Sequence, residues 1–156
     1  MPEFCRHGRF LQNCRICNKP DAKPAPRASA PARTREGRAG AESLEDFVRG
    51  GYRGYFQAVA EDPMTFELTR RNAGTIRTLF STPGIGAGVD ELRADLAAAI
   101  EAGLMAEVDV EFTAAAMVGV GFEVGVRMVA AEPADPESAA DFATRLFLGG
   151  LDRLAE

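Results

Sequence analysis

The chain has little of the chemistry that most enzymes and secreted proteins use. Its 156 residues include no tryptophan, one histidine, three cysteines and two lysines. An odd number of cysteines beside a lone histidine argues against a disulfide framework and favours a reducing compartment. The metalloprotease, serine-hydrolase and phosphate-loop motifs H-E-x-x-H, G-x-S-x-G and G-x-x-x-x-G-K-[ST] are all missing. We therefore expect no enzymatic activity.

Long apolar runs are also missing. The most apolar stretch, Phe112–Ala130, contains Glu123, Arg127 and several glycines, which makes it a poor membrane span. The first stretch, Met1–Pro20, has no continuous apolar core of the kind found in secretory signals. The sequence therefore predicts a cytoplasmic protein without a membrane partner.

The residues of the chain that can bind a metal through sulfur or imidazole are concentrated at its beginning. Cys5, His7, Cys14 and Cys17 form the pattern C-x-H-x6-C-x2-C and include every cysteine and histidine of the chain. Three thiolates and one imidazole match a closed, tetrahedral, structural Zn²⁺ site, in which no position stays open for catalysis. Residues 1–18 are thus predicted to be a zinc knuckle that the metal organises. A redox C-x-x-C pair and a cluster without metal are the alternatives.

Charge divides the chain into an arm and a body. Residues 1–40 hold nine basic and three acidic side chains, which leaves 18 − 9 = 9 basic and 23 − 3 = 20 acidic ones in residues 41–156. The proline-, alanine- and arginine-rich stretch 19–42 has no hydrophobic periodicity and predicts an extended, basic linker. Its arginines could bind nucleic-acid phosphates, and a solvated tether explains them equally well. The candidate phosphate-binding residues are Arg27, Arg33, Arg35 and Arg38.

The body, residues 43–156, is long enough for one domain and has helical periodicity throughout. A capping box at Ser43–Asp46 predicts the first helix, and Pro63 predicts the start of the second. The other helices are expected at Val89–Ala102, at Asp109–Ala131 and from Pro136 to about Leu154. The predicted fold class is an all-α, antiparallel bundle of about five helices.

The last two predicted helices indicate self-association. The first is apolar around nearly its whole circumference, so we expect it to be central or sandwiched between partners. Its G-x-x-x-G spacing would let another helix approach closely. A monomer that buries these faces internally is the alternative. The candidate dimer-interface residues are Gly121, Gly125, Phe142, Leu146, Gly149 and Gly150.

Four passages of the body resemble the C-terminal ligand-sensing and dimerisation domain of TetR-type (tetracycline-repressor-type) bacterial transcriptional regulators. They are Gly51–Phe56 with Glu61–Pro63, Thr69–Asn72, Ala115–Gly119 and Asp141–Leu151. The resemblance covers residues 43–156 and implies a homodimer in which the last two helices form a four-helix bundle. It also implies a pocket for a small, mostly apolar effector. By helix position, the lining would include Phe56, Phe66, Asn72, Ile76, Leu79, Met117 and Phe122.

The arm departs from this family. TetR-type regulators carry a helix-turn-helix domain ahead of the body, and residues 1–42 are too rich in proline and too poor in apolar residues to form one. The function expected from the sequence is therefore that of a regulator-type protein whose body dimerises and binds an effector, without the family's DNA-binding domain. The alternative is an adaptor in which the body only dimerises and the zinc knuckle binds a partner.

Overall fold

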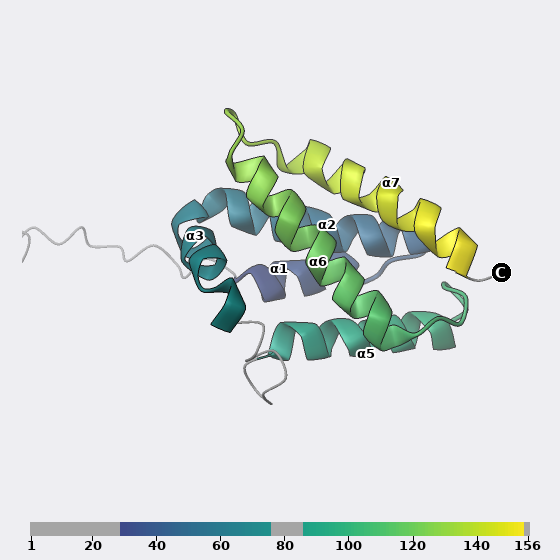
Figure 1. Cartoon of the computed structure of the whole chain (residues 1–156). Coiled ribbons are helices and arrows are strands. Elements are labelled where there is room, and N and C mark those ends of the chain that lie inside the picture. Colours follow the sequence, from purple (N-terminus) through teal and green to yellow (C-terminus); the bar gives the residue numbers. More distant parts are fainter. Residues whose placement is uncertain (1–28, 76–85, 155–156) are drawn as a thin grey trace, which may run out of the picture.

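The computed structural model describes residues 29–75 and 86–154, and this part of the chain is helical and contains no strand (Figure 1). The predicted all-α class is thus confirmed for the described residues. The helices that lie wholly within these residues are α1 (Ala30–Arg38), α2 (Leu44–Glu61), α3 (Pro63–Arg71), α5 (Ala87–Glu101), α6 (Val110–Val129) and α7 (Pro136–Leu154).

The helices begin where the sequence placed their caps. The Ser43 hydroxyl accepts a hydrogen bond from the Asp46 backbone N–H at 3.1 Å, and Asp109 accepts one from Phe112 N–H at 2.9 Å. Pro63 and Pro136 occupy the first positions of α3 and α7, where a missing N–H costs nothing. Gly103 follows α5 with a φ of +70°, which only glycine adopts freely. These residues set the helix boundaries from local chemistry alone.

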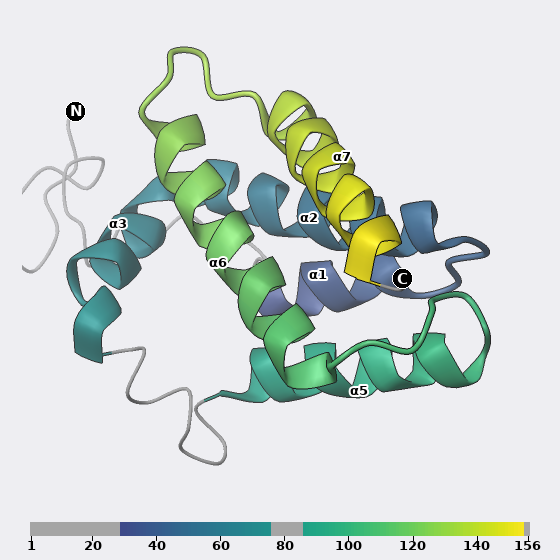
Figure 2. The same ribbon diagram turned by 45° about the vertical axis from the view of Figure 1, so that its right-hand side comes forward.

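Helix α2 lies at the centre of the arrangement. It makes its most extensive contacts with α1 and α7, while α6 crosses it and α5 packs against both α6 and α1 (Figures 1 and 2). The centre of the core is formed by Phe56 and Val48 of α2 together with Leu96 of α5, which are at most 1 % exposed. The Tyr52 ring, also on α2, packs edge-on against Phe147 of α7 with 6.4 Å between ring centroids.

The linker expectation is wrong for the residues of α1. Ala30–Arg38 is helical and docks on α2, although it has no hydrophobic periodicity. The two backbones come so close that a Cβ on Gly37 would overlap the Gly50 carbonyl, and one on Gly54 would overlap the Arg33 carbonyl. Glycines on α2 therefore create the surface on which α1 forms, and this tertiary contact overrides the local sequence.

Helix α6 is less central than its composition predicted. It buries one face, made of Thr113, Ala114, Met117, Gly121, Gly125 and Met128, and leaves much of its other side at the surface. Among the described residues it is also the one helix whose length and apolar composition would suffice to cross a membrane, a test that core helices pass as well. The sequence predicted a helix that is central or sandwiched between partners; within one protomer α6 contacts α2, α5 and α7 and leaves the rest of its circumference at the surface.

Candidate functional site

Several predicted site residues lie outside the described part of the chain. The described residues themselves contain no group of three or more histidine, cysteine, aspartate or glutamate side chains placed to hold a metal ion. The predicted residues that fall outside are Cys5, His7, Cys14, Cys17, Arg27, Ile76 and Leu79.

The arginines of α1 contact the protein's own body. Arg33 forms a two-pronged ion pair with Glu61 at the end of α2, with nitrogen–oxygen distances of 2.8 and 2.6 Å. Arg35 lies 3.4 Å from Glu91 on α5. In the docked helix both guanidinium groups have carboxylate partners, so a phosphate would have to compete with these acids for them.

Arg38 is the most enclosed of the three. Its side chain is 3 % exposed and contacts Asp95 of α5 through Nε at 2.7 Å and through a terminal nitrogen at 2.6 Å. The guanidinium also lies over the Phe47 ring, 5.9 Å from its centroid. A buried cation needs such partners because it has lost its water, so this arginine is a structural anchor of α1.

The predicted effector residues on α2, α3 and α6 form packed core. Phe56, Phe66 and Met117 are buried, and the Phe66 and Phe122 rings lie 5.7 Å apart. Asn72 is exposed, and its amide nitrogen donates to the Leu68 carbonyl at 2.8 Å. Of the aromatic members, Phe66 and Phe122 pack ring against ring, whereas the Phe56 ring packs against Tyr52 and Tyr55.

Two depressions of the described surface lie beside α1. One, of about 410 Å³, runs along the α1–α2 crossing and includes Arg33, Arg53 and Gln57. The other, of about 250 Å³, lies beside the α1–α2 turn and includes Arg38 and Leu104. None of the predicted effector residues lines either depression, and both are open to solvent.

The predicted interface residues separate into two groups. Gly121 and Gly125 are buried inside the protomer: a Cβ on Gly121 would lie 3.6 Å from the Tyr52 and Tyr55 rings, and one on Gly125 would lie 3.2 Å from Phe66. The close approach at these glycines is thus made by helices of the same chain. An interface with a second copy would have to use other residues of α6.

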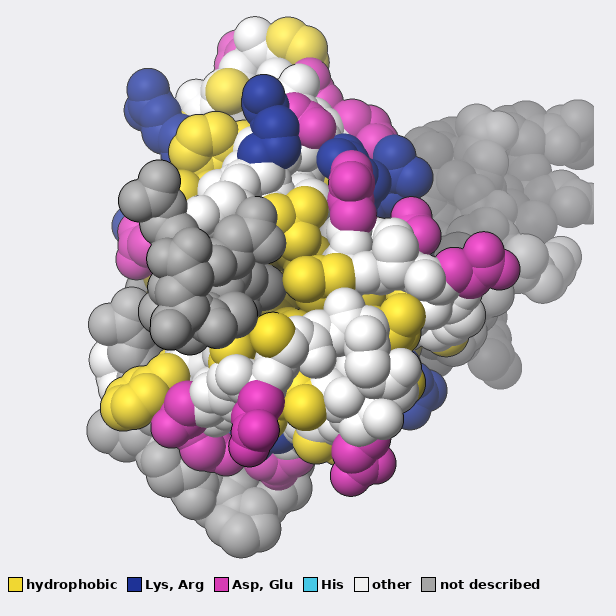
Figure 3. Space-filling model, turned by 90° about the vertical axis from the view of Figure 1, so that its right-hand side faces the viewer, with side chains coloured by type: hydrophobic (Ala, Val, Ile, Leu, Met, Phe, Trp, Pro, Cys, Tyr) yellow, Lys and Arg dark blue, Asp and Glu magenta, His cyan; other side chains and the backbone are white. Residues whose placement is uncertain are grey.

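The predicted interface residues of α7 do lie on the outside. Phe142 and Leu146, one helical turn apart, are each 53 % exposed. Gly149 and Gly150 continue the same row, and a Cβ on either would meet no atom within 4 Å. This row, Phe142, Leu146, Gly149 and Gly150, is hereafter the α7 row. Figure 3 shows apolar side chains reaching the surface, among charged ones, at the end of the molecule where α7 terminates.

Sequence reasoning missed the corresponding surface of α6. Phe112 is 78 % exposed, Ala115 and Ala116 after it are exposed, and Gly119 is half-buried. Their spacing of three, four and seven residues places them on one face, the α6 row. A Cβ on Gly119 would meet no atom within 4 Å. The spacing was present in the sequence, but an all-round apolar helix gives no signal for which side faces out.

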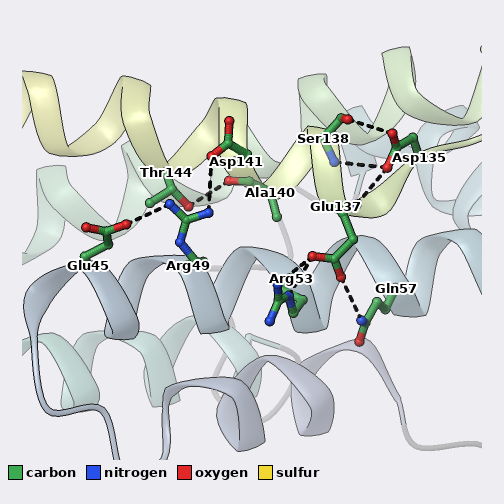
Figure 4. Close-up of polar contacts among 10 residues, drawn as sticks. All are labelled: Glu45, Arg49, Arg53, Gln57, Asp135, Glu137, Ser138, Ala140, Asp141 and Thr144. Carbon is green, nitrogen blue, oxygen red and sulfur yellow. Dashed lines mark hydrogen bonds and ion pairs between the residues drawn. The ribbon is translucent and has the colours of Figure 1, made fainter.

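Polar contacts fix α7 on α2 and thereby set which side faces outward. Arg49 lies between Glu45, at 2.8 Å, and Asp141 of α7, at 3.2 Å (Figure 4). Hydrogen bonding to these two carboxylates raises the pKa of Arg49, so it stays charged. Arg53 binds Glu137 at 2.6 Å, one turn later in α2 and one turn earlier in α7, because the two helices are antiparallel.

The start of α7 is held in the same way by Asp135. This carboxylate accepts hydrogen bonds from the Ser138 hydroxyl at 2.6 Å and from the Ser138 N–H at 3.0 Å (Figure 4). These bonds lower the pKa of Asp135 because they stabilise its ionised form. A charged cap at a helix start also interacts favourably with the helix dipole.

The two tyrosines beside the core offer no acid–base chemistry near neutral pH. Burial raises the pKa of Tyr52, whose hydroxyl donates to the Met117 carbonyl at 3.3 Å. Burial also raises the pKa of Tyr55 to about 12. Both phenols are therefore protonated and act as packing groups.

Comparisons of the chain with protein-family models, with curated proteins and with solved structures found no match.

Proposed function

We propose that this protein is a homodimeric, regulator- or adaptor-type protein whose helical body pairs with a second copy through the α7 row and the α6 row. Dimerisation would hold two N-terminal arms on one particle. The observation that carries the proposal is the α7 row, in which Phe142 and Leu146 project from a helix whose opposite side is fixed on α2. In a twofold dimer the same two rows of both copies would form the interface.

The free energy gained by burying Phe142 and Leu146 in a dimer would suit an interface of moderate affinity. Fully burying a phenylalanine or leucine side chain contributes about 1.5–3 kcal/mol, and about half of that is still to be gained where half of the side chain is exposed. Because each of the two residues occurs twice in a dimer, four side chains add their contributions. The glycines and alanines of the two rows let another helix backbone approach closely, which increases dispersion contacts.

The layered arrangement leaves the arms accessible in such a dimer. Helix α1 and helix α7 contact α2 from different sides, so α1 lies away from the α7 row (Figure 2). The part of the arm that carries the predicted zinc ligands precedes α1 in the chain. Pairing through α7 would therefore not cover the place where each arm begins.

The arm would supply the contact with a further partner. Three thiolates and an imidazole within residues 5–17 are a donor set that suits structural Zn²⁺, and these residues would hold the ion. A zinc ion would contribute order to a segment with too few apolar residues for a core. Two such knuckles on one dimer would bind a repetitive partner more strongly than one, because the second contact is intramolecular.

The described packing favours the adaptor version over effector sensing. A sensor needs space for a ligand among its helices, typically a few hundred cubic ångströms lined by apolar groups. Here Phe56, Phe66 and Met117 are buried in the core, and they do not line either of the two depressions beside α1. An effector pocket at the predicted place would need these side chains to move.

The test is the molar mass of the purified chain in solution, measured by light scattering and by sedimentation over a range of concentrations. We expect the wild-type chain at twice its 16.7 kDa. Phe142→Ser combined with Leu146→Ser should give the monomer with its helical signal intact, because both side chains are already exposed in the protomer.

Helix α3 offers a matched control. Met64 and Leu68 are also one turn apart and are 76 % and 57 % exposed. Met64→Ser with Leu68→Ser should leave the dimer unchanged. A wild-type chain that is monomeric at all concentrations would refute the proposal, and so would a control pair that dissociates the dimer while the α7 pair does not.

A further inference from the structure

Helix α1 is held on the body in an unusual way. It has nine residues, and a helix this short is not stable by itself in water. Its sequence, Ala-Pro-Ala-Arg-Thr-Arg-Glu-Gly-Arg, contains no apolar side chain larger than proline. Hydrophobic anchoring therefore cannot be the main reason that it docks.

The contacts that remain are backbone packing on the α2 glycines and the three arginine–carboxylate pairs. The pairs reach two different helices, because Glu61 ends α2 whereas Glu91 and Asp95 belong to α5. Arg33 and Arg38 are the enclosed members, with side chains 25 % and 3 % exposed. All three arginines of α1 thus bind acids of the body at once.

We propose that α1 is a charge-held strap that masks the arginines of the basic arm from nucleic-acid phosphates. Carboxylates and phosphates bind the guanidinium fork in the same geometry, so an arginine that holds Glu61 or Asp95 is not free to hold a phosphate. The acids of the body are tethered to the strap and therefore compete at high effective concentration. The arm binds a polyanion with its full charge only when α1 leaves the body. This inference does not depend on dimerisation.

The charge distribution of the chain supports this competition. The basic residues are concentrated in the first 40 positions and the acidic ones in the rest. An acidic body repels a polyanion and attracts its own arm, and both effects weaken as salt increases. The strap is thus expected to respond to ionic strength and to any polyanion strong enough to replace the carboxylates.

Binding of a short DNA duplex of arbitrary sequence, followed by fluorescence anisotropy, tests the masking. The strap variant combines Glu61→Gln with Asp95→Asn, which keeps side-chain shape and removes two partners of α1. The control combines Glu101→Gln with Glu107→Gln, two exposed acids outside the ion pairs with α1. Both proteins have the same net charge, so the difference between them reports the strap.

We expect the strap variant to bind DNA about tenfold more tightly than the control at low salt. The slope of log K against log salt should be steeper by about two, because each freed arginine that neutralises a phosphate contributes about 0.9. Equal affinity and equal slope in the two variants would overturn the proposal, since α1 would then hide no phosphate-binding charge.

Hydrogen exchange of the unmodified chain provides a second readout that needs no substitution. Amide protection in residues 30–38 should fall about tenfold between low and high salt, while α2, α5, α6 and α7 keep theirs. Protection of α1 that is independent of salt would show that packing alone holds it. Parallel loss in α1 and the body would show that α1 is part of the core and not a strap. Either result overturns the proposal.

Discussion

Replacing Gly54 by alanine tests the close packing of α1 on α2. Gly54 lies in the middle of α2, and a Cβ there would overlap the backbone carbonyl of Arg33. A backbone atom cannot rotate away as a side chain can, so α1 must shift or detach. Overpacking of this kind costs about 1–3 kcal/mol. Alanine also removes the entropic cost of a glycine in a helix, which returns about 0.5–1 kcal/mol. We therefore expect Gly54→Ala to lower the free energy of unfolding by about 1–2 kcal/mol.

Gly121→Ala is the matched control within α6. Gly121 is also buried and in mid-helix, but a Cβ there would lie 3.6 Å from the Tyr52 and Tyr55 rings, an ordinary contact distance. The same chemical change should therefore be neutral or stabilising by up to about 1 kcal/mol, since it gains helix propensity without overlap. The expected change in the free energy of unfolding thus has opposite signs in the two variants, and the reason is purely steric.

Urea unfolding followed by circular dichroism measures both effects. With a slope of about 2 kcal/mol per molar urea, the midpoint of Gly54→Ala should fall by about 0.5–1 M. Hydrogen exchange should place the loss in α1, at residues 30–38. The packing described at the α1–α2 crossing would be refuted if Gly54→Ala were as stable as Gly121→Ala and kept α1 protected.

Three further substitutions probe a cap, an ion pair and the metal site. Asp109→Ala removes the acceptor of the Phe112 N–H and should lower the free energy of unfolding by about 1 kcal/mol, measured in urea. Hydrogen bonds from Arg70 and Arg71 lower the pKa of Glu67 from 4.5 to about 2, so its stabilising effect is complete above pH 4.5 and is lost as pH falls toward 2. Glu67→Gln should flatten the acid side of the stability–pH curve, and an unchanged curve would contradict this pairing. Cys14→Ser should remove one equivalent of bound zinc, measured by metal analysis, and leave the helical signal nearly unchanged.

Local chemistry made most of the helix boundaries predictable. Ser43, Pro63, Asp109 and Pro136 each act within one turn of the chain, so their effect can be read without knowing the tertiary structure. Gly103 likewise ends α5 through its own backbone conformation. The all-α class follows from these starts and stops together with the apolar spacing between them.

Helix α1 could not be predicted in the same way because its stability is tertiary. The acids that hold Arg33 and Arg38 are 28 and 57 residues away along the chain. The glycines that admit its backbone lie on α2, where Gly50 and Gly54 have the same four-residue spacing as the Gly121–Gly125 pair. Sequence reasoning assigned close helix approach to the pair on α6 and to a second copy. Both glycine pairs pack against other helices of the same protomer. The spacing of glycines indicates that another helix can approach closely, but it does not indicate which helix.

The same limit applies to the candidate sites. Burial of Phe56, Phe66 and Met117 was consistent with either a pocket lining or a packed core, because both place large apolar side chains on inward faces. A packed core is distinguished from a pocket lining only by contacts between the side chains, such as the ring contact of Phe66 with Phe122. The predicted α7 row was easier to locate, since Phe142 and Leu146 follow one face of a helix whose other face is strongly patterned by Ala139, Ala143 and Phe147.

The outer side of α6 distinguishes between the environments that could cover it. Its first half presents Phe112, Ala115, Ala116 and Gly119, and its second half presents the exposed charges Glu123 and Arg127. A bilayer would have to accept both charges within its hydrocarbon, at a cost of several kcal/mol. A helix of a second copy needs to cover the first half only and leaves the charges in water. The division of this face into an apolar half and a charged half is therefore better matched to a protein partner than to lipid. In the proposed dimer, the alanines and the glycine of the α6 row would leave room for Phe142 and Leu146 of the second copy.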